Sequence, residues 1–336
     1  MDMKKWIEEL LEAEVKKPLP ILSYPAVQLL NIGVDELIAS SDTISEGMRL
    51  VAQRTDAAAA VSMMDLSVEA EAFGSDVRFS PDEVPSVLGS IVTSKESAEA
   101  LAVPGTDKGR IALYIESIAK AKRKIADRPV LSGVIGSLSL AGRLIGVSEA
   151  MIAFYEQPEM VHITLEKATQ FLIKYALAYK EAGADGVVIA EPLAGLLSPE
   201  LCEEFSTPYI RRIADAVKSD SFAVVYHNCG NSTVRLIDSI LKIGADMYHF
   251  GNAVSMLEVL EKFPPDITAM GNIDPAGQFK NGTPESISRE TTQLLEKCGG
   301  YKNFIISSGC DIPPTSSWEN IDAFFGAVKK YYSSRA

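Results

Sequence analysis

Cysteines, basic residues and long apolar runs are all scarce in this chain. Four cysteines in 336 residues are too few for a disulfide framework, and the first residues lack the basic and apolar segments of a secretory leader. No stretch is long and apolar enough to predict a helix that crosses a bilayer. We therefore expect a cytoplasmic protein with reduced thiols and no membrane partner.

The shortage of basic residues bears on the choice of partners. The chain carries 32 Lys and Arg against 45 Asp and Glu, a formal net charge of −13. This charge argues against a general nucleic-acid surface, because the phosphate backbone must be neutralised by cations. The glycine-rich loops that bind nucleotide phosphates after a strand are missing as well, which argues against a nucleotide or nicotinamide enzyme.

What the chain does contain is a regular alternation of short apolar runs and helical segments. The hydrophobic fraction of 47% is enough for a sizeable core. About eight runs have the apolar, small or β-branched character of buried strands, and the helices between them are long enough for parallel crossovers. The predicted strands lie at residues 18–25, 57–65, 129–134, 185–190, 222–225, 246–250, 267–272 and from 304 onwards.

This alternation predicts a single α/β domain over residues 1–336, folded as a closed (β/α)8 TIM barrel. Residues 1–17 are predicted to form an amphipathic helical extension, and the proline- and serine-rich region 79–105 an insertion. An open, doubly wound sheet is the alternative. We prefer the barrel because polar residues follow so many strands, and a closed barrel brings all those strand ends to one mouth, where active sites of this fold lie.

Three of these polar residues suggest a metal site. His227 and Cys229 follow the apolar run 222–225, and Cys310 follows the run that begins at Phe304. Two thiolates and one imidazole suit zinc in type and number, and three protein ligands leave one position open for chemistry. The alternative is a buried histidine with two inert cysteines, since free cysteine is among the most buried residues. The shared position after a strand favours the metal site.

Five further side chains at strand ends are candidates for the same site. Glu191 and Asp65 are candidate catalytic acids that take up a proton, and Glu191 competes with water as a fourth zinc ligand. The alternative for each acid is a cap on the next helix. Tyr24, His249 and Asn272 are candidates for lining the pocket and binding the cofactor, although such residues often satisfy loop backbone groups instead.

Several segments resemble the uroporphyrinogen decarboxylase superfamily, and within it the zinc-dependent corrinoid methyltransferases. The resemblance covers nearly the whole chain. Its most specific part is His227-x-Cys229 with the distant Cys310, which matches the zinc motif of the methyltransferase branch and is missing from the decarboxylases. The segments that carry the resemblance are residues 60–65, 69–74, 184–192, 227–230, 271–275 and 308–310.

The resemblance implies an enzyme that binds Zn²⁺ through His227, Cys229 and Cys310. Such an enzyme moves a methyl group from methylcobalamin or a methylated corrinoid protein to a small thiol such as coenzyme M. Zinc turns the thiol into a thiolate, which attacks the methyl group and displaces Co(I). Homocysteine or a folate stays open as the acceptor, and so does assembly of the chain into a homo-oligomer.

Two other functions of the superfamily are alternatives. The decarboxylases hold a substrate rich in carboxylates through an arginine-rich N-terminal segment, whereas residues 18–33 of this chain contain no arginine. We therefore reject decarboxylation. Asp65 matches the aspartate that follows the second strand in the superfamily, and without a pyrrole substrate to bind, that aspartate's role in this chain stays open. A non-catalytic protein that binds a corrinoid or tetrapyrrole without turnover is the second alternative.

Overall fold

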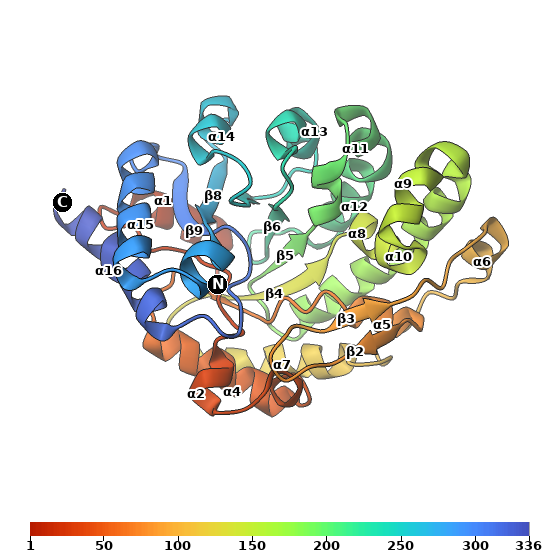
Figure 1. Cartoon of the computed structure of the whole chain (residues 1–336), viewed down its shortest axis with the longest axis horizontal. Helices are drawn as coiled ribbons and strands as arrows, with labels where there is room; N and C mark the ends of the chain where they lie inside the picture. The colour runs from red at the N-terminus through yellow and green to blue at the C-terminus, as the bar shows by residue number, and fades with distance from the viewer. Residues whose placement is uncertain (336) are drawn as a thin grey trace.

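Seven parallel strands curve around the centre of the protein in a computed structural model that describes residues 1–335 (Figure 1). Their spatial order is their order along the chain, so each crossover returns to the neighbouring position in the sheet. The predicted TIM-barrel-like fold is thereby confirmed, with seven strands in the described sheet instead of about eight. The strands are β1 (Ala60–Val61), β4 (Val130–Ile135), β5 (Gly186–Ala190), β6 (Ala223–Asn228), β7 (Met247–Phe250), β8 (Thr268–Ile273) and β9 (Phe304–Ser308).

The missing strand is the first predicted one, at residues 18–25, and that prediction is wrong. The N–H of Leu19 donates to a carbonyl of β9 at 3.0 Å, and the carbonyl of Pro18 accepts from Ala58, just before β1, at 2.9 Å. Pro18 and Pro20 have no N–H to donate, so a regular ladder cannot form on either side. The segment therefore bridges β9 and β1 through isolated hydrogen bonds.

Alternate residues of each strand face the inside of the barrel, as the period of two requires. In β6, Ala223 and Val225 belong to the apolar interior cluster, so His227 two residues later faces the same side. In β7, the same alternation places His249 after the interior residue Met247. The strand register pairs His227 with His249. The barrel wall thus presents two imidazoles on its inner face near the carboxyl ends of the strands.

The amino ends of the strands are covered by α1 (Met3–Glu12), the predicted N-terminal helix. Met3 and Leu10 are buried in the interior cluster, and the N–H of Met3 donates to the carbonyl of Asp220, just before β6, at 2.7 Å. Asp2 caps the helix by accepting from the N–H of Lys5 at 3.0 Å. A ligand therefore approaches the barrel from the carboxyl ends of the strands.

Helices surround the strands and bury a second, larger apolar cluster between themselves and the sheet. The helical region 199–217 is divided at Ser206, because Pro208 lacks the N–H that would continue the helical ladder. The sequence of residues 67–74, which follows a predicted strand and carries two acids, predicts a loop. These residues instead form α5, which ends at Gly74 with a left-handed φ of 106°. No single helix within residues 1–335 is long and apolar enough to span a membrane, although α8 and α9 pass that test together as a pair bent by 101°.

The remaining helices are α2 (Ala26–Leu30), α3 (Val34–Leu37), α4 (Ser41–Arg54), α5 (Val68–Phe73), α6 (Lys95–Ala100), α7 (Ile111–Lys124), α8 (Ser137–Ile145), α9 (Val147–Glu156), α10 (Pro158–Glu181), α11 (Pro199–Phe205), α12 (Thr207–Val217), α13 (Ile237–Leu241), α14 (Met256–Lys262), α15 (Pro284–Cys298) and α16 (Trp318–Ser333), with the shorter turns η1 (Pro192–Leu196), η2 (Thr233–Leu236) and η3 (Pro275–Lys280).

The region predicted to be an insertion, residues 79–105, borders the open end of the barrel. Its strand β3 (Ser86–Leu88) pairs antiparallel with β2 (Asp76–Arg78), and α6 follows. The hairpin and α6 form the orange arm on the right of Figure 1. Because residues 82–86 of the hairpin line the main cavity, this excursion forms part of the rim of the site.

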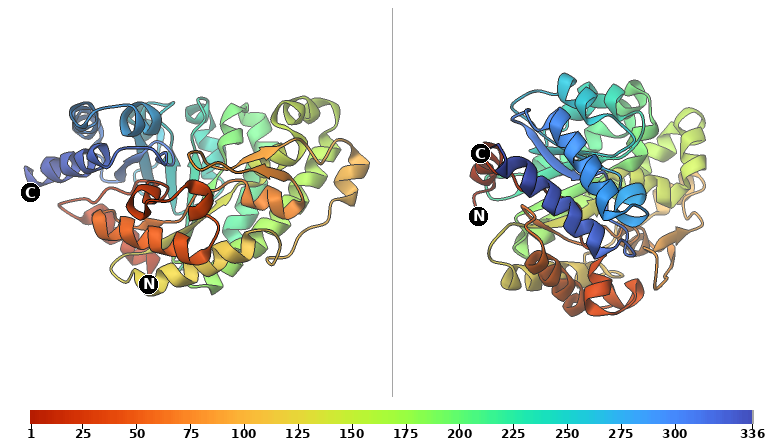
Figure 2. Two further views of the ribbon diagram at one scale, coloured as in Figure 1. Left: turned by 60° about the horizontal axis from the view of Figure 1, so that its bottom comes forward. Right: turned by 60° about the vertical axis from the view of Figure 1, so that its left-hand side comes forward.

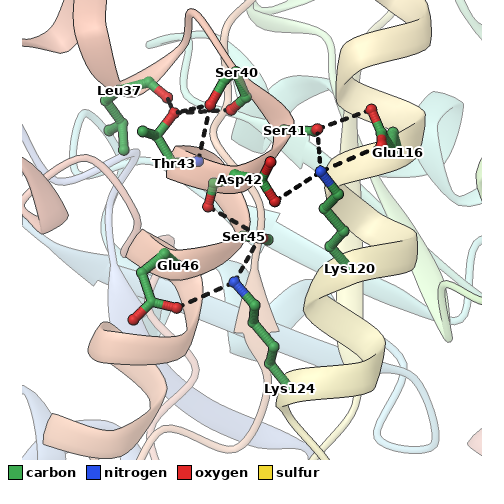
Figure 3. A network of polar contacts seen from close by, with 10 residues as sticks. All are labelled: Leu37, Ser40, Ser41, Asp42, Thr43, Ser45, Glu46, Glu116, Lys120 and Lys124. Carbon is green, nitrogen blue, oxygen red and sulfur yellow. Dashed lines mark hydrogen bonds and ion pairs between the residues drawn. The ribbon is translucent and has the colours of Figure 1, made fainter.

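Polar contacts join α4 to α7 and to α16. Two lysines of α7 reach acids and hydroxyls of α4, and Lys120 Nζ lies 2.7 Å from Asp42 Oδ1 (Figure 3). At the end of α4, Arg54 pairs with Asp322 of α16 at 2.6 Å. The first helices and the last helix of the layer therefore lie together, as both views in Figure 2 show.

Candidate functional site

A cavity of about 490 Å³ lies at the carboxyl ends of the strands. Its wall combines residues that follow β1, β5, β6 and β9 with the hairpin turn 82–86 and Lys280 of η3. Barrel enzymes bind their substrates at this end, and a concave, mostly apolar cavity with a few polar groups is typical of a ligand site. His227, Cys229 and Cys310 all line this cavity.

The side chains of His227, Cys229 and Cys310 meet at one point of the cavity. Their ligand atoms all lie within 4.8 Å of one another. Cys310 Sγ lies 3.5 Å from His227 Nε2, and a tetrahedral zinc ion with ordinary bond lengths would hold such a pair about 3.6 Å apart. The group therefore fits zinc in donor type and in spacing, and three donors leave one position for another ligand.

The two thiols of this group differ in acidity because they lie close to each other. Their contact, together with burial, raises the pKa of Cys310 to about 12, whereas the same contact lowers the pKa of Cys229. The first proton of the pair is therefore released more easily than the second, as expected of coupled sites. A divalent cation would displace both protons, because thiolates are the form that binds metal.

Behind the metal-binding group, a chain of hydrogen bonds fixes the orientation of His227. Its Nδ1 lies 2.7 Å from Nδ1 of His249, and Nε2 of His249 lies 2.7 Å from the hydroxyl of Ser307. Ser307 donates in turn to the carbonyl of Leu19 at 2.7 Å. Burial and the neighbouring His227 hold the pKa of His249 well below its usual value, so its ring is neutral and can accept one hydrogen bond.

These contacts assign one role to each nitrogen. A metal-facing Nε2 on His227 leaves the proton on its Nδ1, which donates to His249. His249 then carries its own proton on Nε2 and donates to Ser307. A partner of this kind sets the tautomer and the ring orientation of a metal-ligating histidine. His249 therefore lies behind the ligand group, outside the cavity wall.

Asn272 holds the loop that supports Cys229. Its side-chain amide donates to the carbonyls of Gly251 and Val254 at 2.9 and 2.8 Å. Gly251 approaches Cys229 so closely that an added Cβ would lie 2.5 Å from both the Cα and the Cβ of Cys229. Asn272 therefore contacts loop backbone groups and lies outside the cavity wall.

Gly251→Ala is expected to displace Cys229 and weaken metal binding. The new methyl group would clash with main-chain as well as side-chain atoms of Cys229, so the loop must move. We expect the zinc dissociation constant to rise by about tenfold or more, measured by competition with a chromophoric chelator. Gly326→Ala in α16 is the matched control, because nothing lies within 4 Å of its new methyl group. Equal zinc affinity in the two variants would contradict this role of the loop.

Asp65 lies in a buried ion pair outside the cavity wall. One of its oxygens contacts the Arg110 guanidinium and accepts from the Tyr114 hydroxyl at 2.9 Å, and the other accepts from the Ser67 hydroxyl at 2.6 Å. Arg110 also pairs with Glu71 at 2.7 Å. These contacts tie the end of β1 to α5 and α7, which is a structural arrangement.

Glu191 lies at the amino end of α8, also outside the cavity wall. Its two carboxylate oxygens accept from the N–H groups of Leu138 and Ser139, at 2.9 and 2.6 Å, and from the Ser139 hydroxyl. Burial raises the pKa of Glu191 to about 7, although these hydrogen bonds act in the opposite sense. Both oxygens therefore accept hydrogen bonds from the first turn of α8, as expected if Glu191 caps that helix.

Tyr24 and Asp311 line the cavity with polar atoms that have no hydrogen-bond partner within residues 1–335. Burial raises the pKa of both groups well above their usual values. For Asp311 the thiol of Cys310 adds to this rise, and the nearby amides of Met64 and Ile312 oppose it. Unpaired buried polar atoms are exceptions in folded proteins, and these two point to a ligand in the cavity.

Comparison with known proteins assigns the chain to a family. The pattern of the family described as uroporphyrinogen decarboxylase (URO-D) matches residues 22–331. The chain belongs to the uroporphyrinogen decarboxylase family. The predicted membership is thereby confirmed.

Members and relatives of the uroporphyrinogen decarboxylase family include methyltransferases as well as decarboxylases. The methylcobamide:CoM methyltransferase MtbA of Methanosarcina acetivorans is 30% identical over 273 residues, which is 80% of this chain and 78% of the relative. A uroporphyrinogen decarboxylase of Coxiella burnetii is 26% identical over 286 residues, 81% of this chain and 77% of the relative. A methyltransferase structure from Methanosarcina mazei shares the fold, with a TM-score of 0.85 over 99% of both chains at 24% identity. All three are enzymes, and this member of the family is an enzyme as well.

Sequence reasoning missed several polar residues of the cavity wall, among them Asp311 and Arg143. Asp311 directly follows Cys310, and that position was the signal that could have found it. Arg143 of α8 lines the cavity, but it lies well past the end of β4, so the position directly after a strand gave no signal for it.

Glu69 is expected to make the stability of the protein depend on pH. One of its oxygens accepts from the N–H of Ile135 at 3.0 Å, and the other has no partner within residues 1–335. Burial raises the pKa of Glu69 from the usual 4.5 to about 7 in the folded state. The folded state therefore binds this proton more tightly than the unfolded state, so the stabilisation is present below pH 4.5 and is lost as the pH rises through 7.

Glu69→Gln removes the charge and keeps the acceptor for Ile135. We expect the variant to exceed the parent in free energy of unfolding by about 3 kcal/mol near pH 8, and by much less near pH 5. Urea unfolding at the two pH values measures this difference. The exposed Glu261→Gln in α14 is the control and should show no such gain. A variant less stable than the parent at the higher pH would show that Glu69 is held as a needed anion.

Proposed function

We propose that this protein transfers a methyl group from a methylated corrinoid to a small thiol, with zinc held by His227, Cys229 and Cys310. The observation that carries this proposal is the convergence of three donor atoms within 4.8 Å of one another in the wall of the main cavity. Relatives named methylcobamide:CoM methyltransferases, at 30% and 28% identity, support corrinoid-dependent methyl transfer.

The chemistry follows from the donor set. When bound, zinc lowers the pKa of a thiol in its open coordination position, so that the thiol reacts as a thiolate at neutral pH. The acceptor's sulfur forms a bond to the methyl carbon while the cobalt–carbon bond breaks, and that electron pair stays on cobalt. The His249–Ser307 chain keeps His227 in the tautomer that coordinates through Nε2.

The cavity wall supplies the remaining requirements of this reaction. Ile21, Met64 and Ile312 are apolar side chains of the wall that exclude water from the reacting sulfur. Asp311 is an acid of the wall whose buried oxygens have no hydrogen-bond partner within residues 1–335, so we assign to it a hydrogen bond to the bound acceptor, and the proton that the thiol releases passes to water. Glu191 and Asp65 are engaged by α8 and Arg110, so we assign them to positioning these elements.

The alternatives are less well supported by this cavity. A decarboxylase substrate rich in carboxylates needs several cations, and the cavity wall contains one arginine and one lysine, Arg143 and Lys280. A folate acceptor brings no thiol to the open zinc position. A protein that binds a corrinoid without turnover would have no need for the metal-binding group of His227, Cys229 and Cys310.

A thiol screen with free methylcobalamin tests the proposal. Zinc-loaded protein should convert methylcobalamin to its demethylated form in the presence of a suitable thiol, visible as a change in cobalamin absorbance, and should yield the methyl thioether. Protein stripped by a chelator should lose this activity and regain it with zinc. Unchanged absorbance with coenzyme M, homocysteine and other small thiols would refute the proposal.

A further inference from the structure

Arg143 is a cation in the wall of the main cavity that has no partner among residues 1–335. It projects from α8 and lines the same cavity as His227, Cys229 and Cys310. No carboxylate oxygen of residues 1–335 lies within 4.0 Å of its guanidinium, and the side chain makes no hydrogen bond within that part of the chain. Burial lowers the pKa of Arg143, but an arginine stays charged at neutral pH.

This situation is exceptional among the arginines of the described chain. The others either pair with an acid or a backbone carbonyl, or lie exposed to solvent. Arg110, for example, pairs with both Asp65 and Glu71. A guanidinium that is partly removed from water and has no anion loses hydration without compensation. An anion supplied by a ligand would remove this cost.

None of the acids around Arg143 serves as its anionic partner. Glu69 acts on Arg143 only through its field, because no ion pair joins them, and burial raises the pKa of Glu69 to about 7. Asp311 lies in the same cavity wall, and no ion pair joins it to Arg143 either. Asp82 and Glu83 are exposed on the hairpin at the rim, where water screens their charge. An anionic ligand that enters the cavity can therefore pair with the guanidinium of Arg143.

We propose that Arg143 selects the methyl acceptor by binding an anionic group, a sulfonate or a carboxylate, at the end opposite the thiol. The planar fork of a guanidinium matches two oxygens of either group, and it also keeps its charge at any pH where the enzyme works. The inference rests on the proposed function, because it takes the thiol end of the acceptor to lie at His227, Cys229 and Cys310. Arg143 is then the residue that determines specificity for an anionic acceptor.

Four thiols that differ only in their tail test this assignment. They are 2-mercaptoethanesulfonate, 3-mercaptopropionate, 2-mercaptoethanol and cysteamine, each assayed with free methylcobalamin and zinc-loaded protein. Loss of a charged hydrogen-bonding partner should lower kcat/KM of Arg143→Gln by about 10- to 100-fold for the two anionic thiols, mainly through KM. The same variant should change kcat/KM by less than about twofold for 2-mercaptoethanol. Arg143→Lys keeps the charge without the fork and should fall between the parent and Arg143→Gln.

Two control variants separate Arg143 from other cations. Arg123→Gln removes an exposed arginine of α7 and should leave all four thiols unaffected. Lys280→Gln removes the other cation of the cavity wall. If Lys280→Gln shows the selective loss and Arg143→Gln does not, the anion site belongs to Lys280 and the proposal is overturned. Equal losses for all four thiols in Arg143→Gln would likewise overturn it, because a mere counter-charge for Glu69 acts on every acceptor alike.

A binding measurement without turnover distinguishes this inference from the proposed function. Ethanesulfonate and propionate carry the anionic tail without a thiol, and each should raise the Tm of the parent but not of Arg143→Gln, whereas ethanol should raise neither. If no thiol is methylated and ethanesulfonate still stabilises the parent through Arg143, the anion site stands and methyl transfer to thiols fails. If thiols are methylated regardless of their tails and ethanesulfonate has no effect, methyl transfer stands and the role of Arg143 fails.

Discussion

Cys310→Ala is expected to leave the protein folded but without zinc and without methyl transfer. Cys310 lies in the cavity wall, 3.5 Å from the ring nitrogen of His227, and its loss leaves two protein donors. A zinc site with two ligands is weaker than one with three, so we expect the dissociation constant to rise by more than about 100-fold. The protein should be purified with about one zinc per chain in the parent and close to none in the variant, measured by mass-spectrometric metal analysis.

The buried Cys298 supplies the matched control. It lies in α15, fully buried and away from the cavity wall, so Cys298→Ala removes a thiol of the same kind without removing a ligand. That variant should keep its zinc and its methyl-transfer activity, at a modest loss of stability. If Cys310→Ala kept a full equivalent of zinc, Cys310 could not be one of the ligands.

Asp65→Asn is expected to destabilise the fold without removing the metal. The substitution leaves the buried Arg110 facing an amide in place of a carboxylate, and the remaining partner, Glu71, lies on one side only. Removing one partner of a buried ion pair costs about 3–5 kcal/mol, because the other charge stays buried. We expect a loss of about 3 kcal/mol in the free energy of unfolding, measured by urea denaturation, since Glu71 is retained. Zinc content in the folded fraction should be unchanged.

An exposed ion pair gives the comparison for Asp65. Arg54 pairs with Asp322 between α4 and α16, and both side chains are about half exposed. Asp322→Asn should therefore change stability by less than about 1 kcal/mol. If Asp65→Asn were as stable as the parent but inactive with every thiol, the aspartate would have a catalytic role and the structural assignment would be wrong.

The alternation of strands and helices was enough to predict the barrel, because each buried strand leaves an apolar run and each helix a periodic one. It failed at residues 18–25, where Pro18 and Pro20 remove the N–H groups that a ladder needs. It also failed at residues 67–74, where Glu69 and Glu71 looked like loop acids but lie in the first turn of α5. Apolar patterning reports burial, and it does not report which backbone groups find partners.

The candidate site likewise contains residues that the sequence could indicate and residues that only the structure reveals. His227, Cys229 and Cys310 could be proposed from the sequence, because residue type and position after a strand are both visible there. The contacts of His249 with His227 and Ser307 depend on strand register, which a single sequence does not contain. The isolation of Arg143 depends on the absence of an acid within ion-pair distance, which only the positions of the side chains in space reveal. Sequence therefore indicated the ligand group, and structure added the residues that orient it and face it.

X-ray absorption at the zinc edge tests the central claim most directly. With His227, Cys229 and Cys310 as ligands, the purified protein should show two sulfur neighbours at about 2.3 Å and nitrogen or oxygen at about 2.0 Å. Addition of a reactive thiol should raise the sulfur count from two to three. A protein without zinc, or zinc whose neighbours include no sulfur from the protein, would contradict the account.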